Sequence, residues 1–229
     1  MAGTKSSPTD VVTHTDLESE RRIRSELLLR CPGSSIEGEE FDDQFGDTGI
    51  GWIVDPIDGT VNFLYGLPVV SVSIAATMNG TVVAGAVVDV LQGEIFSATV
   101  GEGARSNGSS IKCSSTSLLT QALVGTGFAY DALRRSAEAD LLTHVLPQCR
   151  DIRCMGSAAL NLCWVGAGRL DAFFERHIQT YDYAAGALIA AEAGASVMLP
   201  ANNLTDLTMA ATPLVFDALE DLVGQSQTG

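Results

Sequence analysis

The sequence has little positive charge. Lys and Arg number 13 against 28 Asp and Glu, which gives a formal net charge of −15. Such a surface repels the phosphates of nucleic acids and of anionic lipids, and this argues against nonspecific DNA binding. Charged residues are only 18% of the chain and hydrophobic residues are 46%, a balance that excludes wholesale disorder. A local cluster of the many carboxylates would suit a divalent cation such as Mg2+.

Cysteine motifs, an export signal and a long apolar helix are also missing. The five cysteines form no CxxC pair and no cluster with His, which predicts a reduced, cytoplasmic chain. The polar N-terminus lacks the apolar core of a secretory signal. The longest uncharged stretch, residues 59–88, contains Pro68 and the turn pair Asn79-Gly80. It is therefore predicted to form two strands and a hairpin, with no membrane contact.

The remaining pattern predicts a layered α+β fold of one large domain or two joined lobes. The first helix is expected within residues 10–30, capped by Thr15 or Asp16, and a turn-rich acidic segment follows at 34–51. A short buried strand, Trp52 to Val54, is expected to stop at Asp55-Pro56. Further strands are expected at 69–78, 81–90, 94–99, 122–126, 150–154 and 171–175, and helices at 133–146, 157–167 and 181–194. A boundary near residue 110 predicts an N-terminal lobe, 1–110, and a C-terminal lobe, 111–229.

Two carboxylates at the end of the predicted strand are the first candidates for chemistry. Asp55 and Asp58 stand three residues apart, and the proline between them favours an extended or turned backbone. That geometry can aim both side chains and the Ile57 carbonyl into one space, which suits Mg2+. The alternative is structural: Asp58-Gly59 forms an ordinary turn and Asp55 caps a helix. The spacing alone leaves both interpretations open.

The whole segment, DPIDGTVNF, resembles the signature of the inositol monophosphatase family of Mg2+-dependent, lithium-sensitive phosphatases. Other blocks resemble that family in the same order, with the strongest similarity to bacterial and especially actinobacterial members. They are Lys5–Asp10 with Thr15-Asp16, Gly38–Glu40, Gly101–Ile111, Gly156–Ala159 with Asp171–Glu175, and Tyr181–Gly186. The resemblance implies the αβαβα sandwich shared with fructose-1,6-bisphosphatase. The C-terminal lobe would then supply Asp182 and the substrate contacts.

The resemblance also implies roles for individual residues. Glu39, Asp55 and the Ile57 carbonyl would hold a first Mg2+, and Asp55, Asp58 and Asp182 a second; a weaker third is expected near Glu39. Catalytic roles fall to Glu39 and Thr60, which orient the attacking water, and to Asp16 beside Thr60. No covalent phosphoenzyme is implied. The substrate-binding residues would be Asp58, Gly59, Thr60, Ala158, Glu175 and Asp182, with the backbone N–H groups of Gly59 and Thr60 receiving phosphate oxygens.

Several of these residues have a simpler interpretation. Asp182 and Asp16 could each be only a helix cap, and Glu175 only a solvated charge at a strand end. Tyr181 departs from the usual Trp of the family motif. The acidic residues Asp42, Asp43 and Asp47 receive no role.

A long helix usually precedes the Lys5–Asp10 segment in the family. Strands 69–78 and 81–90 carry apolar residues on both faces in places, which predicts cover on both sides. In the 229-residue chain we therefore expect one face to remain a partly exposed apolar patch.

The function expected from these features is Mg2+-dependent hydrolysis of myo-inositol monophosphate or a similar small phosphorylated polyol. One alternative keeps the chemistry on histidinol phosphate, 3'-phosphoadenosine 5'-phosphate or fructose 1,6-bisphosphate, because a few pocket contacts decide the substrate. A second alternative is a noncatalytic regulatory protein that binds RNA or the transcription machinery, as some bacterial members do. The acidic balance argues against direct nucleic-acid binding, and the family analogy leads us to expect a homodimer.

Overall fold

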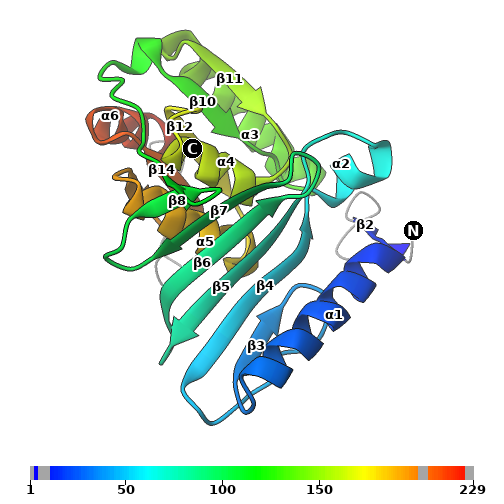
Figure 1. Cartoon of the computed structure of the whole chain (residues 1–229). Helices are drawn as coiled ribbons and strands as arrows, with labels where there is room; N and C mark the ends of the chain where they lie inside the picture. Colours follow the sequence, from blue (N-terminus) through cyan, green and yellow to red (C-terminus); the bar gives the residue numbers. More distant parts are fainter. Residues whose placement is uncertain (1–2, 5–10, 201–205, 225–229) are drawn as a thin grey trace.

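The chain folds into five layers in a computed structural model that describes residues 3–4, 11–200 and 206–224. Helix α1 and the short α2 lie outside a large sheet, α4 and α5 lie between this sheet and a smaller one, and α3 and α6 cover the far side (Figure 1). This arrangement confirms the predicted layered αβαβα sandwich. The Lys5–Asp10 part of the N-terminal motif lies outside the described residues.

The large sheet has seven strands in the order β3-β4-β5-β6-β7-β8-β9. Strand β3 pairs parallel to β4, and all the following neighbours are antiparallel. The strands are β3 (Ser35–Gly38), β4 (Ile50–Asp58), β5 (Ser71–Met78), β6 (Thr81–Asp89), β7 (Glu94–Thr99), β8 (Ala104–Ser106) and β9 (Ser109–Ser110). The hairpin predicted at Asn79-Gly80 is present, and both residues have positive φ, as its tight turn requires.

The smaller sheet has five strands in the order β11-β10-β12-β14-β13. Its strands are β10 (Leu123–Thr126), β11 (Asp151–Cys154), β12 (Ala172–Arg176), β13 (Ser196–Met198) and β14 (Leu207–Ala211). Strands β10, β11 and β12 are parallel, and β14 is antiparallel to both of its neighbours. A separate two-stranded ribbon joins β1 (Gly3–Thr4) to β2 (Val11–Val12).

The central helices carry small residues on the faces that touch the sheet and each other. The helices are α1 (His14–Arg30), α2 (Thr60–Tyr65), α3 (Ala132–Val145), α4 (Ala158–Gly166), α5 (Thr180–Glu192) and α6 (Pro213–Gly224), with 3-10 turns at Leu119–Gln121 and Leu146–Gln148. A Cβ at Gly85 of β6 would press on the backbone of Ala185, and one at Gly186 would press on Leu162. Close approach of α5 to both β6 and α4 therefore depends on these glycines.

Four local predictions were wrong. The N-cap of α1 is Thr13, whose side chain accepts from the backbone of Thr15 and Asp16, so neither of those residues is the cap. Strand β4 does not stop at Asp55-Pro56 but runs to Asp58 through an irregular pairing. The turn-rich segment after residue 34 opens with a true edge strand, β3. The sequence interpretation assigned no element after residue 194, where β13, β14 and α6 lie.

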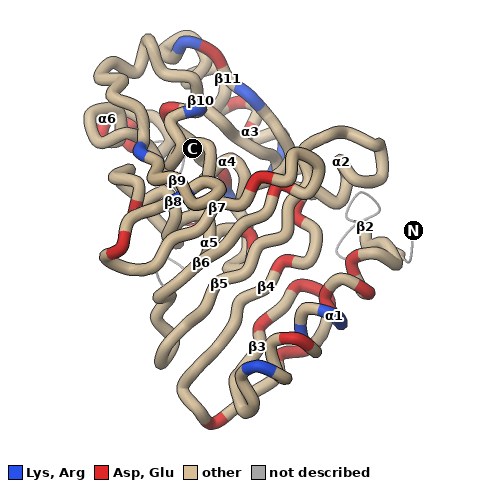
Figure 2. Tube along the Cα trace, viewed as in Figure 1, with Lys and Arg blue, Asp and Glu red and all other residues tan. Residues whose placement is uncertain are grey.

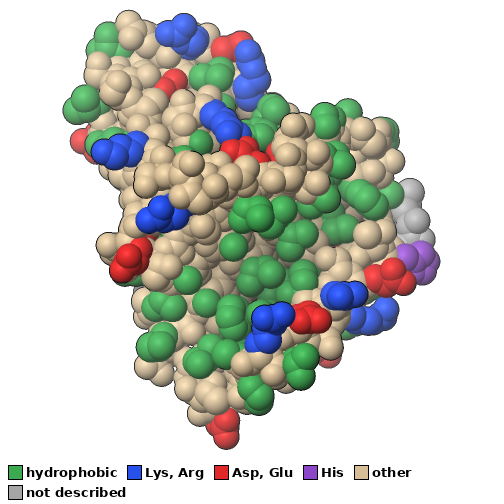
Figure 3. All heavy atoms as spheres, in the orientation of Figure 1, with side chains coloured by type: hydrophobic (Ala, Val, Ile, Leu, Met, Phe, Trp, Pro, Cys, Tyr) green, Lys and Arg blue, Asp and Glu red, His purple; other side chains and the backbone are tan. Residues whose placement is uncertain are grey.

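The face of the large sheet opposite α4 and α5 is only partly covered. Figure 2 shows that β5 to β7 carry almost no charge, whereas α1 carries both acidic and basic residues. Figure 3 shows hydrophobic side chains gathered on this face beside α1. Val72 and Ile74 are half-buried there, and Ile95 is 48% exposed. In the described part of the chain, no helix is long and apolar enough to cross a membrane. All five cysteines are free.

Candidate active site

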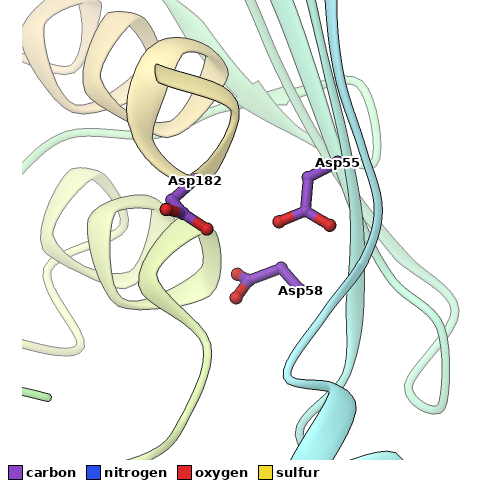
Figure 4. Close-up of side chains that lie close together, drawn as sticks. All are labelled: Asp55, Asp58 and Asp182. Carbon is purple, nitrogen blue, oxygen red and sulfur yellow. The ribbon is translucent and has the colours of Figure 1, made fainter. Parts of the chain in front are cut away.

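The end of β4 is irregular where the candidate carboxylates lie. Strand β4 pairs regularly with β5 up to Asp55 opposite Ser73, and pairing resumes at Asp58 opposite Ser71 after a shift of register. Pro56 has no N–H to give to the ladder, which favours such a bulge at this point. The shift re-aims the strand so that Asp55 and Asp58 both face the central helix layer (Figure 4).

Three aspartates meet there. The carboxylates of Asp55 and Asp58 point toward Asp182 at the start of α5, and one oxygen of each lies within 4.8 Å of the others (Figure 4). Asp55 is 1% exposed and Asp58 is 8% exposed. Two of the acids come from the large sheet and one from a helix more than a hundred residues later in the chain, so the fold itself creates this cluster.

Asp182 is not the N-cap of α5. The cap is Gln179, and Asp182 is the third helical residue, whose side chain accepts from the Gln179 backbone N–H at 2.5 Å in a capping box. A carboxylate in the first turn is also favoured by the helix dipole. The second Asp182 oxygen need not serve the cap, so capping and facing the other two aspartates are compatible.

Asp58 is held by donors from both halves of the chain. The Ser157 hydroxyl donates to its Oδ2 at 2.6 Å, and the backbone N–H groups of Ala158 and Ala159 donate at 3.3 and 2.8 Å. Ser71 on β5 adds a fourth hydrogen bond at 3.2 Å. Ser157, Ala158 and Ala159 lie at the start of α4, so the N-terminus of this helix stabilises the ionised form of Asp58.

The electrostatics of the cluster favour a bound cation. Burial raises the pKa of Asp55 well above its ordinary value, and the negative charges of Glu39, Asp58 and Asp182 raise it further. Burial also raises the pKa of Asp58, although its four hydrogen bonds lower it in part. Carboxylates that share a buried site repel one another unless a proton or a cation lies between them. An all-oxygen donor set of this kind fits a hard divalent metal ion.

Glu39 adjoins this cluster. Its side chain lies close enough to raise the pKa of Asp55, and its backbone N–H donates to the Val54 carbonyl at 3.3 Å. The Ile57 carbonyl accepts from the Thr60 hydroxyl at 3.0 Å, and the Ile57 N–H donates to Asp55 Oδ1 at 3.0 Å. The structure thus brings the Glu39 side chain next to Asp55 and holds the Ile57 backbone between Asp55 and Thr60.

Thr60 and Asp16 form a buried pair. The Thr60 hydroxyl also faces Asp16 Oδ1 at 3.1 Å, so its single proton has two acceptors, Asp16 and the Ile57 carbonyl. Asp16 is fully buried and also belongs to the capping box of α1, where its Oδ2 accepts from the Thr13 N–H at 3.0 Å. Asp16 is therefore more than a cap. Gly59, the N-cap of α2, has a φ of 96°, a backbone conformation that favours glycine.

Glu175 lies at the end of β12 and is not simply a solvated charge. It is half-buried, and burial raises its pKa well above the ordinary value, with further increases from Asp182, Asp58 and Glu138. Its carboxylate packs against the backbone of Gly127, where a Cβ would overlap it. Ala158 is buried at the start of α4. Glu175 therefore belongs to the same electrostatic neighbourhood as the aspartates.

Sequence reasoning gave no role to the residues that hold the site together. Ser71 and Ser157 position Asp58, and the buried Asn62 amide donates to the carbonyls of Val69 and Met155, which ties α2 to the loop before α4. The small residues before α4 gave a usable signal, because Ser is a favoured N-cap. Isolated polar residues such as Ser71 carry no sequence pattern that marks them.

Comparison with known proteins gives consistent matches. A sequence profile described as the inositol monophosphatase family matches residues 1–226. The chain is 49% identical over 228 residues to the inositol-1-monophosphatase of Mycobacterium leprae, covering 94% of this chain and 78% of that protein. A protein of Pasteurella multocida named Nus factor SuhB is 39% identical over 196 residues, 85% of this chain and 73% of that protein. The structure of Mycobacterium tuberculosis SuhB superposes with a TM-score of 0.84 at 45% identity, covering 93% of this chain and 84% of that one.

Proposed function

The chain belongs to the inositol monophosphatase family and is a phosphatase, and we propose that it hydrolyses myo-inositol monophosphate or a similar small polyol phosphate in a Mg2+-dependent reaction. Water is added across the phosphorus–oxygen ester bond, giving the free polyol and inorganic phosphate. The observation that carries the proposal is the junction of Asp55, Asp58 and Asp182 beside the Thr60–Asp16 pair.

The acidic residues would hold the metal ions. We assign Glu39, Asp55 and the Ile57 carbonyl to one Mg2+ and Asp55, Asp58 and Asp182 to a second. When bound, the two ions would neutralise the carboxylates, lower the pKa of the attacking water and stabilise negative charge on the leaving oxygen. This assignment is supported by the buried carboxylates, which repel one another unless a proton or a cation lies between them.

Thr60 would orient the attacking water with Glu39. Because the Thr60 proton is directed to Asp16 or to the Ile57 carbonyl, a lone pair of Thr60 Oγ1 is left to accept from the water. Buried Asp16 keeps the hydroxyl in that orientation. The water would then attack phosphorus from the side opposite the leaving oxygen, without a covalent enzyme intermediate.

The substrate would bind on the same surface. The backbone N–H groups of Gly59 and Thr60 are proposed to receive phosphate oxygens, and Asp58 and Asp182 to face the ester side of the phosphate. Glu175 and Ala158 are proposed to contact the polyol hydroxyl groups. A partly buried carboxylate next to the aspartates supports this role for Glu175, because hydroxyl donors would satisfy its oxygens.

A panel of phosphomonoesters tests the proposal. Turnover of inositol 1-phosphate, histidinol phosphate, fructose 1,6-bisphosphate and 3'-phosphoadenosine 5'-phosphate is measured with Mg2+, with EDTA, and with Mg2+ plus Li+. The expected result is highest turnover on inositol 1-phosphate, loss in EDTA and inhibition by Li+. Highest turnover on another ester would transfer the proposal to that substrate, and activity that persists in EDTA would exclude the metal mechanism.

A noncatalytic regulatory role is the second candidate. It is favoured by the similarity to the Pasteurella multocida protein named Nus factor SuhB. Retention of the three aspartates and of the Thr60–Asp16 pair favours the phosphatase. Absence of turnover on every ester of the panel, with the fold intact, would favour the regulatory role. We also propose a homodimer, which light scattering on the purified chain would test.

A further inference from the structure

One face of α1 touches the segments that form the site. Residues three or four apart lie on the same face of a helix. Asp16 faces Thr60 at the start of α2, and one turn later the Ser19 hydroxyl donates to the Pro56 carbonyl at the β4 bulge at 3.1 Å. The next two polar residues of this face, Glu20 and Arg24, contact the chain around Glu39.

Glu20 and Arg24 form an ion pair that holds the loop after β3, with the Glu20 side chain fully buried and the Arg24 side chain 12% exposed. Glu20 is fully buried; its Oε1 accepts from Arg24 Nε at 2.7 Å, and its Oε2 accepts from the Glu40 backbone N–H at 2.8 Å. The two terminal nitrogens of Arg24 donate to the carbonyls of Phe41 and Asp42 at 3.1 and 3.2 Å. The Arg24 guanidinium also lies over the Phe41 ring.

These contacts fix the backbone on both sides of Glu39. On one side the Glu39 N–H is tied to Val54 of β4, and on the other the next N–H, that of Glu40, is tied to Glu20. Gly38 lies directly against the ion pair, because a Cβ there would overlap the Glu20 carboxylate. The glycine of the Gly38-Glu39-Glu40 motif is thus explained by the close approach of α1.

We propose that Glu20 and Arg24 are positioning residues that hold Glu39 in place for divalent metal binding. The inference rests on the proposed function, in which Glu39 is a metal ligand. Burial of the Glu20 carboxylate removes its hydration, and this loss must be offset by its ion pair and hydrogen bonds. The three hydrogen bonds that the pair makes to the backbone all go to one short segment, Glu40 to Asp42, which directly follows Glu39. Groups that orient metal ligands without touching the metal commonly change metal affinity tenfold or more.

Isothermal titration calorimetry with Mg2+ alone tests this inference on the wild-type chain and three variants. Arg24→Lys keeps the charge next to Glu20 but loses the fork to the two carbonyls. Glu20→Gln removes the negative charge. Its amide oxygen can still accept from either Arg24 Nε or the Glu40 N–H, but its amide nitrogen, a donor, then faces the other. Arg21→Ala is the matched control. Arg21 is an exposed residue of the same helix, and its guanidinium carbon also lies over the Phe41 ring, 5.2 Å from the ring centre. Urea unfolding of each protein separates metal affinity from stability.

We expect Arg24→Lys and Glu20→Gln to weaken Mg2+ binding about tenfold and Arg21→Ala to change it less than about twofold. At saturating Mg2+ the turnover of both positioning variants should return to within about twofold of wild type, because the ligands themselves are intact. Folded variants with wild-type Mg2+ affinity would overturn the inference, even if they unfold more easily. If Arg24→Lys does not fold, Glu20→Gln decides alone. A wild-type chain that binds no Mg2+ would instead refute the proposed function on which the inference depends.

Discussion

Replacing Asp55 by Asn should make the metal-free protein more stable while it destroys the activity. Asp55 is buried beside Glu39, Asp58 and Asp182, and its pKa is raised by burial and by their charges. Two ionised carboxylates 4.8 Å apart repel each other by about 3 kcal/mol at an effective dielectric constant of about 20. The oxygens of the three aspartates lie within this distance, so fully ionised groups would repel at least this strongly, and a carboxyl group with a raised pKa takes up a proton and escapes part of the repulsion.

The Asn side chain fits the same place. Its oxygen can accept from the Ile57 N–H as Asp55 Oδ1 does, and its amide can donate to the neighbouring Glu39 carboxylate. We therefore expect a gain of about 2 kcal/mol in the free energy of unfolding without metal, or about 4–8 °C in melting temperature. Loss of a ligand shared by two metal ions should lower turnover about 1,000-fold, the equivalent of about 4 kcal/mol.

Differential scanning fluorimetry in EDTA and in Mg2+, with turnover measured on the same samples, checks both expectations. Asp140→Asn, which neutralises an exposed carboxylate on α3, is the control and should change neither quantity. A lower melting temperature of Asp55→Asn in EDTA would refute the account of the site as a cluster of repelling charges. Near-normal turnover would refute the assignment of Asp55 as a shared metal ligand.

Because the pKa values of Asp55 and Asp58 are raised in the fold, their contribution to stability without metal should be fully present below their ordinary value of 3.8 and be lost as the pH rises through the raised values. The stabilisation by Mg2+ should instead grow with pH, and melting curves of wild type and Asp55→Asn at several pH values, with and without Mg2+, test the sign. Ser157→Ala should cost about 1–2 kcal/mol in urea unfolding, since it removes both the N-cap of α4 and a donor to Asp58; an unchanged midpoint would contradict this role. Glu175→Gln should reduce kcat/KM for inositol 1-phosphate about tenfold but spare p-nitrophenyl phosphate, which has no polyol hydroxyls; an equal loss on both would exclude a polyol contact. Ile95→Thr should lower the fluorescence of an apolar dye bound to the wild-type protein and change the melting temperature by less than about 2 °C; undiminished fluorescence would place the dye elsewhere.

The sequence predicted the sheets well where alternation or turn chemistry decides the backbone. Asn79 and Gly80 adopt positive φ readily, which favours a tight hairpin turn at this point. The strands on either side are rich in β-branched residues, which favour extended backbone. The continuation of β4 past Pro56 was missed, because proline normally ends a ladder and only the Ser71 pairing with Asp58 shows that the strand resumes. Strand β14 lies between two partners and is buried along its length, so it has no alternating pattern to reveal it.

The candidate site was also predictable only in part. Its aspartates stand in motifs that a reader of the sequence can find, and the resemblance to a family supplied Asp16, Glu39 and Asp182. The supporting residues could not be found, because their roles are long-range. Glu20 reads as an ordinary solvated glutamate on a polar helix, and its burial against Gly38 and the Glu40 N–H appears only when α1 packs on the sheet. The same holds for the Asn62 amide, whose two acceptors are 7 and 93 residues away.

The hydrogen bonds around Asp58 also set an order of events for the chain during synthesis. Three of its four donors lie 99 to 101 residues downstream, so they leave the ribosome long after Asp58 itself. An N-terminal sheet that forms first holds an aspartate without its helix donors and without Asp182 as neighbour. Metal binding at the site proposed above would therefore wait until α4 and α5 have docked, which would make it a late step in folding. A growing chain would then have no complete active site until synthesis has passed α5, within the second sheet.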